Sequence, residues 1–358
     1  MGPQDPTCVP VRFYAGLGGG WGVVGDGAFQ RGLRGLCHRA PLEPQLAAER
    51  GGAVPGKGVA LYGYFGHGNL GDEALREAWI RALSPDFEVR TLAPPRLPKG
   101  KGPWLFCGGI LQDRTSLRSL LFYVAAIRLA ARGGPVGLVA VGCELSSPLG
   151  RRLVRGVLRK AGFVSARDEE GLRQLSALGG DVRPARDPVL AWPPPPRGGS
   201  GPILVNLVPS LPRTVCKEVL QKARDLAEKL GSPLQGLVMA PEDARALGGL
   251  PLLRPTTPKE ALKAIASSPL LVGARLHALE LALVAGTPFV PLPYSAKVEG
   301  FLSLVERDLP ARVPRTPDRP EEALSPSLRE GLLRARARLA EEAQKGIEDV
   351  RNWLRSLA

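Results

Sequence analysis

Residues 58–83 read GVALYGYFGHGNLGDEALREAWIRAL, and this stretch decides the fold. Residues 59–62 are a short apolar run of the kind that forms a buried strand. A glycine-rich turn follows at 63–71, and over 72–83 the apolar residues recur at helical spacing. A strand, a glycine turn and a helix in this order predict the first half of a parallel βαβ unit.

The same alternation continues along the chain. Further strands are expected at 104–107, 136–141, 163–165, 203–207, 235–239, 269–272 and 288–292. Helices are expected between them, at 115–132, 148–160, 168–177, 214–230, 258–266 and 276–285. We therefore predict an α/β protein of two doubly wound, Rossmann-like domains with a cleft between them. Ligands are expected at the carboxyl ends of the strands.

The predicted domain boundaries follow from these patterns. The first Rossmann-like domain covers 58–190, a Pro/Gly-rich linker 191–202, and the second domain 203–325. Residues 326–358 are expected to form one or two charged amphipathic helices. Residues 1–57 show no sustained periodicity, so we expect either a disordered extension or a start codon placed too far upstream.

The composition excludes several classes of protein. Hydrophobic residues make up 44% of the 358, which excludes a disordered chain. No apolar run reaches the roughly 18 residues that span a bilayer, and no secretory signal is visible, so a cytoplasmic protein is expected. Five scattered cysteines predict free thiols, without a disulfide framework or structural zinc. Many prolines and two methionines fit a thermophile or a GC-rich genome.

The formal net charge of +14 indicates an anionic partner. The basic residues are spread along the chain, aromatic residues are only 5%, and no nucleic-acid-binding motif occurs, so nucleic acid is not the expected partner. The predicted helix over 150–160 carries five basic residues mostly opposite an apolar face. It is either a solvated face of a packed helix or a peripheral contact with anionic lipid at the inner face of the membrane.

The glycine loop at 63–73 is the first candidate site. It follows a strand and opens a helix, so its glycines let backbone amides approach an anion at the helix N-terminus. Asn69 and Gly71 belong to this loop. Asp72 and Glu73 lie in the first helical turn, where they either take part in chemistry or complement the helix dipole.

Two further candidate sites follow the next strands. Gly108 and Gly109 permit tight backbone geometry, and Asp113 beyond them is either a proton acceptor or a helix cap. Arg167 follows the strand at 163–165 and can grip a phosphate or carboxylate with two hydrogen bonds. The alternative for Arg167 is a structural ion pair with the neighbouring Asp168 or Glu169.

The fourth candidate site joins Arg275, His277 and Lys297, which follow the last two strands. We expect Arg275 and the helix N-terminus to disfavour a protonated imidazole at His277, and a bound anion to reverse this. His277 could then serve as a general acid. The alternative is a structural histidine.

Together and in this order, these motifs resemble the polysaccharide pyruvyl transferase family, CsaB type, over residues 58–305. The resemblance implies a fold like that of the GT-B glycosyltransferases, with the acceptor side in the first domain and C-terminal helices that cross back to it. It implies transfer of pyruvate from phosphoenolpyruvate, as co-substrate, onto two hydroxyls of one sugar of a cell-wall polysaccharide or its lipid-linked precursor. The product is a cyclic ketal, which typically serves as a ligand for anchoring S-layer proteins.

The resemblance also assigns roles. Arg275, Leu276 and His277 match the family's Arg-Leu-His donor motif, whereas Arg167 matches the arginine of its Ser-x-Arg-Asp motif and Lys297 the lysine after its Tyr-Asp-Pro. His277 is then the acid, with Asp72 or Asp113 as base or acceptor ligand, and no metal or redox cofactor is required. The residues assigned to the acceptor or to the loops are Asn69, Gly71, Glu73, Gly108 and Gly109.

The chain departs from the family pattern in two places. Cys107 stands where a glycine is usual, and Ser295-Ala296 replaces Asp-Pro before Lys297. Two other functions stay open on the sequence alone: a GT-B glycosyltransferase that uses a nucleotide sugar, and a non-catalytic protein that binds anionic polymers.

Overall fold

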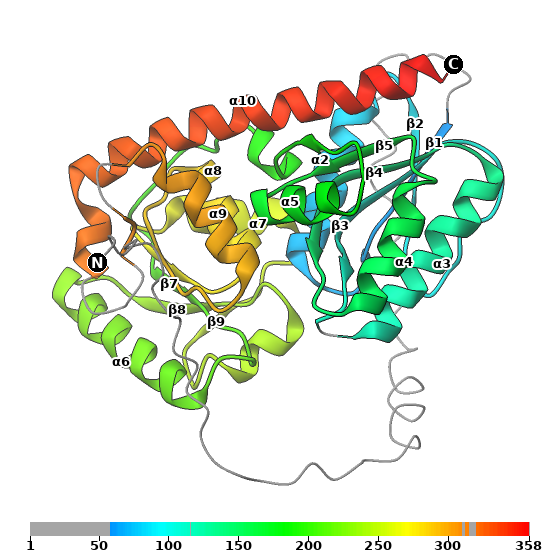
Figure 1. Ribbon diagram of the computed structural model, residues 1–358. Helices are drawn as coiled ribbons and strands as arrows, with labels where there is room; N and C mark the ends of the chain where they lie inside the picture. Colours follow the sequence, from blue (N-terminus) through cyan, green and yellow to red (C-terminus); the bar gives the residue numbers. More distant parts are fainter. Residues whose placement is uncertain (1–57, 115, 310–311, 315–319, 358) are drawn as a thin grey trace, which may run out of the picture. The chain divides into compact units, whose positions relative to one another are not determined.

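Two parallel β-sheets organise the chain, as Figure 1 shows for the computed structural model. The structure describes residues 58–114, 116–309, 312–314 and 320–357, so the expectation for residues 1–57 lies outside the described part. The strand order is β2-β1-β3-β4-β5-β6 in the first sheet and β11-β10-β7-β8-β9 in the second, with all neighbouring strands parallel. The predicted α/β class with two doubly wound sheets is confirmed.

The first sheet and its helices extend to residue 191. The strands are β1 (Gly58–Tyr62), β2 (Glu88–Leu92), β3 (Trp104–Gln112), β4 (Val136–Glu144), β5 (Phe163–Ala166) and β6 (Arg183–Pro184). The helices are α2 (Leu70–Leu83), α3 (Leu117–Gly133), α4 (Pro148–Leu158) and α5 (Glu169–Ala177), followed by the 3₁₀ helix η1 (Pro188–Ala191).

The second sheet begins after a stretch without helix or strand at 192–202. Its strands are β7 (Ile203–Asn206), β8 (Leu234–Leu237), β9 (Leu252–Leu253), β10 (Leu271–Gly273) and β11 (Phe289–Pro291). The helices are α6 (Arg213–Leu230), α7 (Pro258–Ser267), α8 (Leu276–Ala285), α9 (Ala296–Glu306) and α10 (Pro326–Ser356), with 3₁₀ helices η2 (Pro241–Arg245) and η3 (Pro320–Leu324).

Helices cover both faces of each sheet. Alternate residues of the first sheet pack against α3, α4 and α5 on one face, and against α2 and the end of α10 on the other. The second sheet packs against α6 on one face and against α7, α8 and α9 on the other. This two-sided burial explains why the strands read as continuous apolar runs instead of alternating with polar residues.

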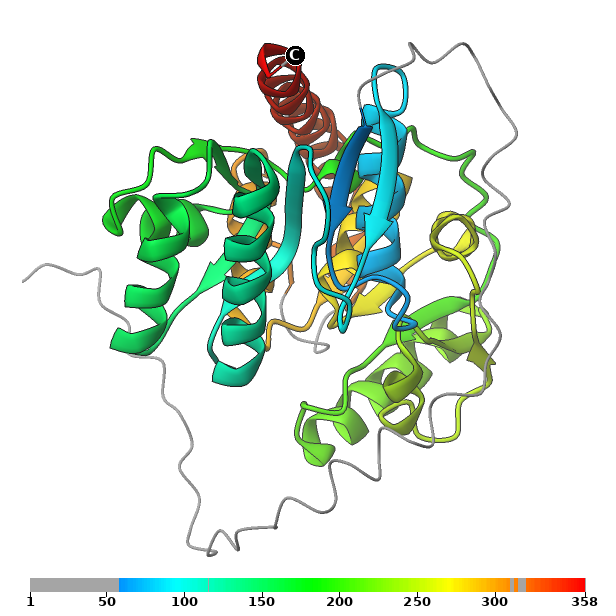
Figure 2. The same cartoon turned by 90° about the vertical axis from the view of Figure 1, so that its right-hand side faces the viewer.

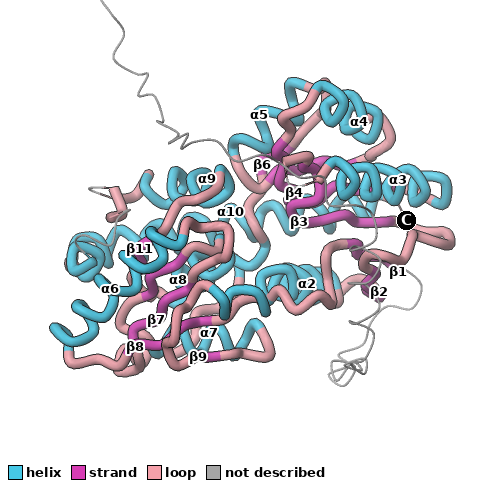
Figure 3. The backbone as a smooth tube through the Cα atoms, turned by 90° about the horizontal axis from the view of Figure 1, so that it is seen from below, coloured by secondary structure: helices cyan, strands magenta, loops and turns pink. Residues whose placement is uncertain are grey.

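Helix α2 packs against the first sheet on one face and against helices α7 and α8 on the other, and Figure 3 shows the two groups of strands on either side of it. One face of α2, with Leu70 and Ala74, belongs to the core built around α7 and α8. Its other face, with Leu75 and Trp79, packs on the first sheet. The helix that follows the glycine loop is therefore fixed by both halves, which holds the loop in place between them.

The C-terminal segment crosses back to the first sheet, as predicted, and of the one or two helices expected it forms one, α10, seen nearly end-on in Figure 2. Leu339 packs in the core of the second sheet, and Val350 in that of the first. A salt bridge of 2.7 Å from Arg351 to Asp86 supports the crossing. In the part of the chain that the structure describes, no helix combines the length and apolar character needed to cross a membrane.

Several elements differ from the sequence expectation. Strand β3 runs on through Gly108 to Gln112, because a bulge with a positive φ of 89° at Gly108 lets the strand continue past the glycines. Helix α2 begins at Leu70, two residues early, because the Asn69 side chain accepts the amide of Gly71 and caps it. Strand β2 and helix α9 were not expected.

Candidate active site

A cavity of about 380 Å³ lies among residues at the carboxyl ends of strands from both sheets. Its lining comes from the glycine loop and the start of α2, the second half of β3, the first turns of α3, the residue after β5, and the segments after β8, β10 and β11. All predicted site residues line it except Glu73 and Asp113. Those that do are Asn69, Gly71, Asp72, Gly108, Gly109, Arg167, Arg275, Leu276, His277 and Lys297.

His277 lies in the first turn of α8 with its two ring nitrogens in different surroundings. Nε2 is buried, 3.6 Å from Asp187 Oδ2 and 3.7 Å from Glu280 Oε2. Nδ1 lies beside Gly71 so closely that a Cβ at position 71 would overlap it. Two carboxyl groups thus lie on the Nε2 side of the ring, and Nδ1 lies at the cavity wall where α2 begins.

The two carboxyl groups determine the charge of the imidazole. Burial alone would lower the pKa of His277, but the contact with Asp187, joined by the charge of Glu280 where that group is ionised, outweighs it, so the pKa is raised. The expectation that Arg275 and the helix N-terminus disfavour the protonated ring is therefore wrong. It failed because the carboxyl groups of Asp187 and Glu280 come from positions that the motif does not contain.

Asp187 and Glu280 were missed by the sequence reasoning. Asp187 is fully buried, and although burial works against ionisation, its contacts with His277 and Arg167 lower its pKa. Burial, reinforced by the charge of Asp187, raises the pKa of Glu280 to about 8, so Glu280 carries its proton at neutral pH. Glu280 could have been noticed in the sequence, because it is the one acidic residue of a helix that is apolar apart from His277. At Asp187 the sequence offers only an Asp-Pro pair, which is typical of a turn.

Asp187, His277 and Glu280 also form a group that could hold a metal ion, with one ligand atom from each lying within 4.8 Å of the others. Arg167 Nη1 lies 3.4 Å from Asp187 Oδ2, the same oxygen that faces His277. A guanidinium at that oxygen already supplies the positive charge that a metal ion would bring. The geometry fits a carboxyl pair that orients an imidazole better than it fits a metal centre.

The cationic residues Arg167 and Lys297 face the cavity from opposite sheets. A Cβ at Gly109 would lie 3.8 Å from Lys297 Nζ and 4.0 Å from Arg167 Nη2, so both cations approach the bulged backbone of β3. Lys297 remains accessible from the cavity, yet partial desolvation and then the charge of Arg167 lower its pKa. Among the described residues, Lys297 pairs with no carboxylate, so its ammonium is available to an anionic ligand.

Arg275 is held by acidic partners from η2, the 3₁₀ helix that follows β8. Its Nε lies 2.8 Å from Asp243 Oδ2, and its Nη2 lies 2.6 Å from both Asp243 Oδ1 and Glu242 Oε1. Asp243 Oδ2 in turn accepts a hydrogen bond of 3.1 Å from the side-chain amide of Asn206, so the guanidinium is fixed in one orientation. Two carboxylates already balance Arg275, and Arg167 likewise lies 3.6 Å from Asp168 Oδ2 and 3.4 Å from Asp187 Oδ2, as the structural alternative for Arg167 predicted. Among the described residues that line the cavity, Lys297 is therefore the cation without a carboxylate partner.

Asp72 is the acidic residue that lines the cavity in the described part of the chain. Desolvation raises its pKa, and the charges of His277, Lys297 and Arg167 act in the opposite direction. A carboxylate with a raised pKa is a better proton acceptor than an exposed one. The position and environment of Asp72 therefore suit a general base.

Asp113 and Glu73 lie outside the cavity lining and hold local structure. Asp113 accepts hydrogen bonds from the amide and hydroxyl of both Ser146 and Ser147, at 2.5–2.9 Å, just before α4. Burial alone would raise the pKa of Asp113, but these bonds lower it to about 2. Glu73 accepts the amide of Gly66 and so ties the glycine loop to α2.

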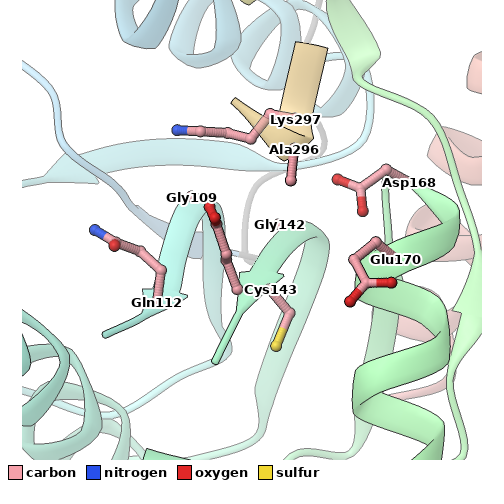
Figure 4. Close-up of a pocket in the computed structure, with 9 residues that line it drawn as sticks. Gly109, Gln112, Gly142, Cys143, Asp168, Glu170, Ala296 and Lys297 are labelled. Atoms are coloured by element: carbon pink, nitrogen blue, oxygen red, sulfur yellow. The ribbon is translucent and has the colours of Figure 1, made fainter. Parts of the chain in front are cut away.

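A small second cavity of about 20 Å³ adjoins the first and shares Gly109, Gln112 and Lys297 with it. Figure 4 shows Lys297 and Gln112 on one side of this pocket and the acidic side chains of Asp168 and Glu170 on the other. The acidic side chains would repel an anion placed there. An anionic ligand is therefore directed to the larger cavity, on the side of Lys297 and Gln112.

The comparisons with known proteins agree with this arrangement. The sequence profile described as "Polysaccharide pyruvyl transferase" matches residues 69–296. No curated protein sequence matches. Among solved structures, UDP-GlcNAc 2-epimerase from Neisseria meningitidis bound to UDP-GlcNAc is similar, with a TM-score of 0.57 at 13% identity, over 84% of this chain and 100% of that one.

UDP-N-acetylglucosamine 2-epimerase from Rickettsia bellii is also similar, with a TM-score of 0.52 at 12% identity, over 84% of this chain and 97% of that one. At such low identity these likenesses concern the fold alone. They show that the two sheets form the GT-B-like arrangement predicted from the sequence.

Proposed function

Because this chain belongs to the polysaccharide pyruvyl transferase family, we propose that it is of the CsaB type, with phosphoenolpyruvate as donor. It transfers pyruvate to two hydroxyls of one sugar in a cell-wall polysaccharide or its lipid-linked precursor, forming a cyclic ketal and releasing phosphate. The observation that carries the proposal is the placement of His277. Its Nε2 is held by two carboxyl groups, and its Nδ1 lies at the wall of a cavity that Lys297 and Arg167 also line.

Binding of the donor follows from the charges in the cavity. Phosphoenolpyruvate carries up to three negative charges on its phosphate and carboxylate groups. Arg167 and Lys297 offer charge-assisted hydrogen bonds to these groups, and the start of α2 adds the favourable end of a helix dipole. Arg275, held in place by Asp243, supplies a third cationic contact of fixed orientation.

The first chemical step needs an acid. Protonated His277 donates its Nδ1 proton to the methylene carbon of phosphoenolpyruvate, which becomes a methyl group and leaves an oxocarbenium-like centre at the adjacent carbon. The raised pKa favours the protonated form of His277 before the donor binds. The buried carboxylate of Asp187 stabilises the imidazolium, and general acids of this kind contribute about 10²–10⁴-fold in rate.

The remaining steps need a base and a leaving group. A sugar hydroxyl attacks the oxocarbenium-like carbon and gives its proton to Asp72. Phosphate then leaves, the second hydroxyl attacks the same carbon, and its proton departs with the phosphate. The proton on Asp72 is returned to His277 for the next turnover, so the net reaction consumes one phosphoenolpyruvate and one diol.

This reaction requires neither a metal ion nor a redox cofactor in any step. We place it in the cytoplasm, where phosphoenolpyruvate is available, and assign the ketal the role of a ligand that anchors S-layer proteins. The composition fits an enzyme from a thermophile.

The proposal is tested by phosphate release from phosphoenolpyruvate in the presence of cell-wall glycan fragments. His277→Ala should lower kcat by at least about 100-fold, the lower limit for a general acid. His67→Ala is the matched control, because His67 is exposed, does not line the cavity, and contacts only the ring of Tyr64 and the carbonyl of Pro94 in the interactions that the structure shows. Equal turnover by both variants would overturn the assignment. Hydrolysis or transfer from UDP-GlcNAc instead of phosphoenolpyruvate would point to a nucleotide-sugar glycosyltransferase.

A further inference from the structure

The outer faces of α3 and α4 form a surface of unusual composition. We name it the α3–α4 face and define it by nine residues. They are the leucines Leu117, Leu121 and Leu149 and the arginines Arg118, Arg128, Arg132, Arg151, Arg152 and Arg155. All nine side chains are exposed, the leucines at 37%, 45% and 49%. Neither helix contains an aspartate or a glutamate.

The two helices present one continuous surface. Figures 1 and 2 show α3 and α4 side by side against the same face of the first sheet, and their inner residues share one core. Gly156 of α4 lies under Arg128 of α3, since a Cβ at position 156 would be 3.0 Å from Arg128 Nη2. The arginine row of α3 therefore continues directly into that of α4.

The leucines gather at the end of this surface that is nearest to the cavity. Leu117 and Leu149 are the first and second residues of their helices, and Leu121 is one turn further along α3. Ser119, in the same first turn of α3 as Leu117, lines the cavity. Both helices follow strands of a parallel sheet, so their first turns lie at the same edge as the candidate active site.

We propose that the α3–α4 face binds the surface of an anionic lipid bilayer, with the leucines entering the headgroup region and the arginines contacting lipid phosphates. Exposed leucines beside a purely basic surface match the pattern of interfacial helices. Nucleic acid fits less well, because these helices expose no aromatic side chain for base stacking and three leucines would face a polar backbone. Binding of this face to a bilayer would present the cavity to a lipid-linked acceptor, and this consequence rests on the proposed function. The binding of the bilayer does not depend on the proposed function.

The test is sedimentation of the full chain with vesicles of phosphatidylglycerol and phosphatidylcholine, and with vesicles of phosphatidylcholine alone. The first variant carries Arg151→Glu, Arg152→Glu and Arg155→Glu. Each basic side chain near an anionic surface contributes about fivefold in binding, so this variant should bind at least roughly 100-fold more weakly. Its control carries Arg213→Glu, Lys217→Glu and Arg224→Glu, which make the same charge change on exposed positions of α6, a helix that also contains acidic residues.

A second variant, Leu117→Ser, Leu121→Ser and Leu149→Ser, tests the apolar contribution. Its control, Val215→Ser, Leu230→Ser and Leu333→Ser, removes exposed apolar side chains from other helices. We expect the wild type and both controls to bind the anionic vesicles and both α3–α4 variants to lose binding, with circular dichroism unchanged.

Binding that survives either α3–α4 variant, or no binding by the wild type, would overturn the proposal. If only the arginine variant lost binding, the face would be a general polyanion site, and competition by single-stranded RNA would identify it as such. Phosphate release with soluble glycan fragments, measured on the same variants, is expected to stay unchanged. This readout separates a failure of membrane binding from a failure of the proposed enzymatic function.

Discussion

Replacement of Asp187 by asparagine is the most informative single change in the buried group behind His277. The amide has the shape of the carboxyl group and can still accept the amide hydrogen of Val189, which Asp187 Oδ1 accepts at 3.1 Å. It removes the negative charge that lies 3.6 Å from His277 Nε2. Asp187 does not line the large cavity, so any effect on catalysis must pass through His277 or Arg167.

The magnitude follows from the geometry. Two unit charges 3.6 Å apart attract by about 4.6 kcal/mol at an effective dielectric constant of about 20. Arg167, 3.4 Å from the same oxygen, offsets part of this attraction, so we expect Asp187→Asn to cost the transition state about 2 kcal/mol. That corresponds to a roughly 30-fold lower kcat, with the KM for phosphoenolpyruvate changed much less.

The pH dependence of kcat distinguishes a positioning role from a merely structural one. The reaction uses protonated His277, so kcat should fall as pH rises through the pKa of that group. Asp187 helps to raise this pKa, and its loss should move the alkaline limb to lower pH. Glu280→Gln is the control, because Glu280 is protonated below its pKa of about 8 and resembles an amide there. An Asp187→Asn profile parallel to that of the wild type would refute the reasoning.

Three further changes test other parts of the site. Gly71→Ala places a methyl group against His277 Nδ1 and should lower kcat by about 100-fold in the phosphate-release assay, since small displacements of an acid are costly. Lys297→Gln removes an unpaired cation and should raise the KM for phosphoenolpyruvate by about 10- to 100-fold. Asp113→Ala should lower the free energy of unfolding in urea by about 1–2 kcal/mol, while Asp72→Asn should lower kcat instead. Because the folded-state pKa of Asp113 is lowered to about 2, its contribution is present above its unfolded-state pKa of about 3.9 and lost as pH falls toward 2. Unchanged stability of Asp113→Ala, or unchanged kcat of Asp72→Asn, would contradict these assignments.

The positions of most helices and strands could be predicted from the sequence, because two-sided burial leaves long apolar runs. Helix α8 was predicted to the residue. Strand β2 escaped because it is an edge strand with largely exposed side chains and no apolar run. The extension of β3 escaped because a glycine pair at 108 and 109 is typical of a turn, and only the neighbouring strands show that it is a bulge.

The residues of the candidate site also divide into those that the sequence could predict and those that it could not. Arg275 and His277 could be predicted because they lie in one short motif after a strand. The partners that set their charge come from elsewhere: Asp187 is 90 residues before His277, and Asp243 is 32 residues before Arg275. Burial and proximity across such separations are properties of the folded chain, and they reversed the expected direction of the His277 pKa shift.

The most direct test of the account is to incubate the protein with phosphoenolpyruvate and cell-wall glycan fragments and to follow phosphate and glycan together. We predict that phosphate appears in step with a pyruvate ketal on the glycan, and that both disappear in His277→Ala but not in His67→Ala. Phosphate release without ketal formation, or ketal formation that survives His277→Ala, would contradict it.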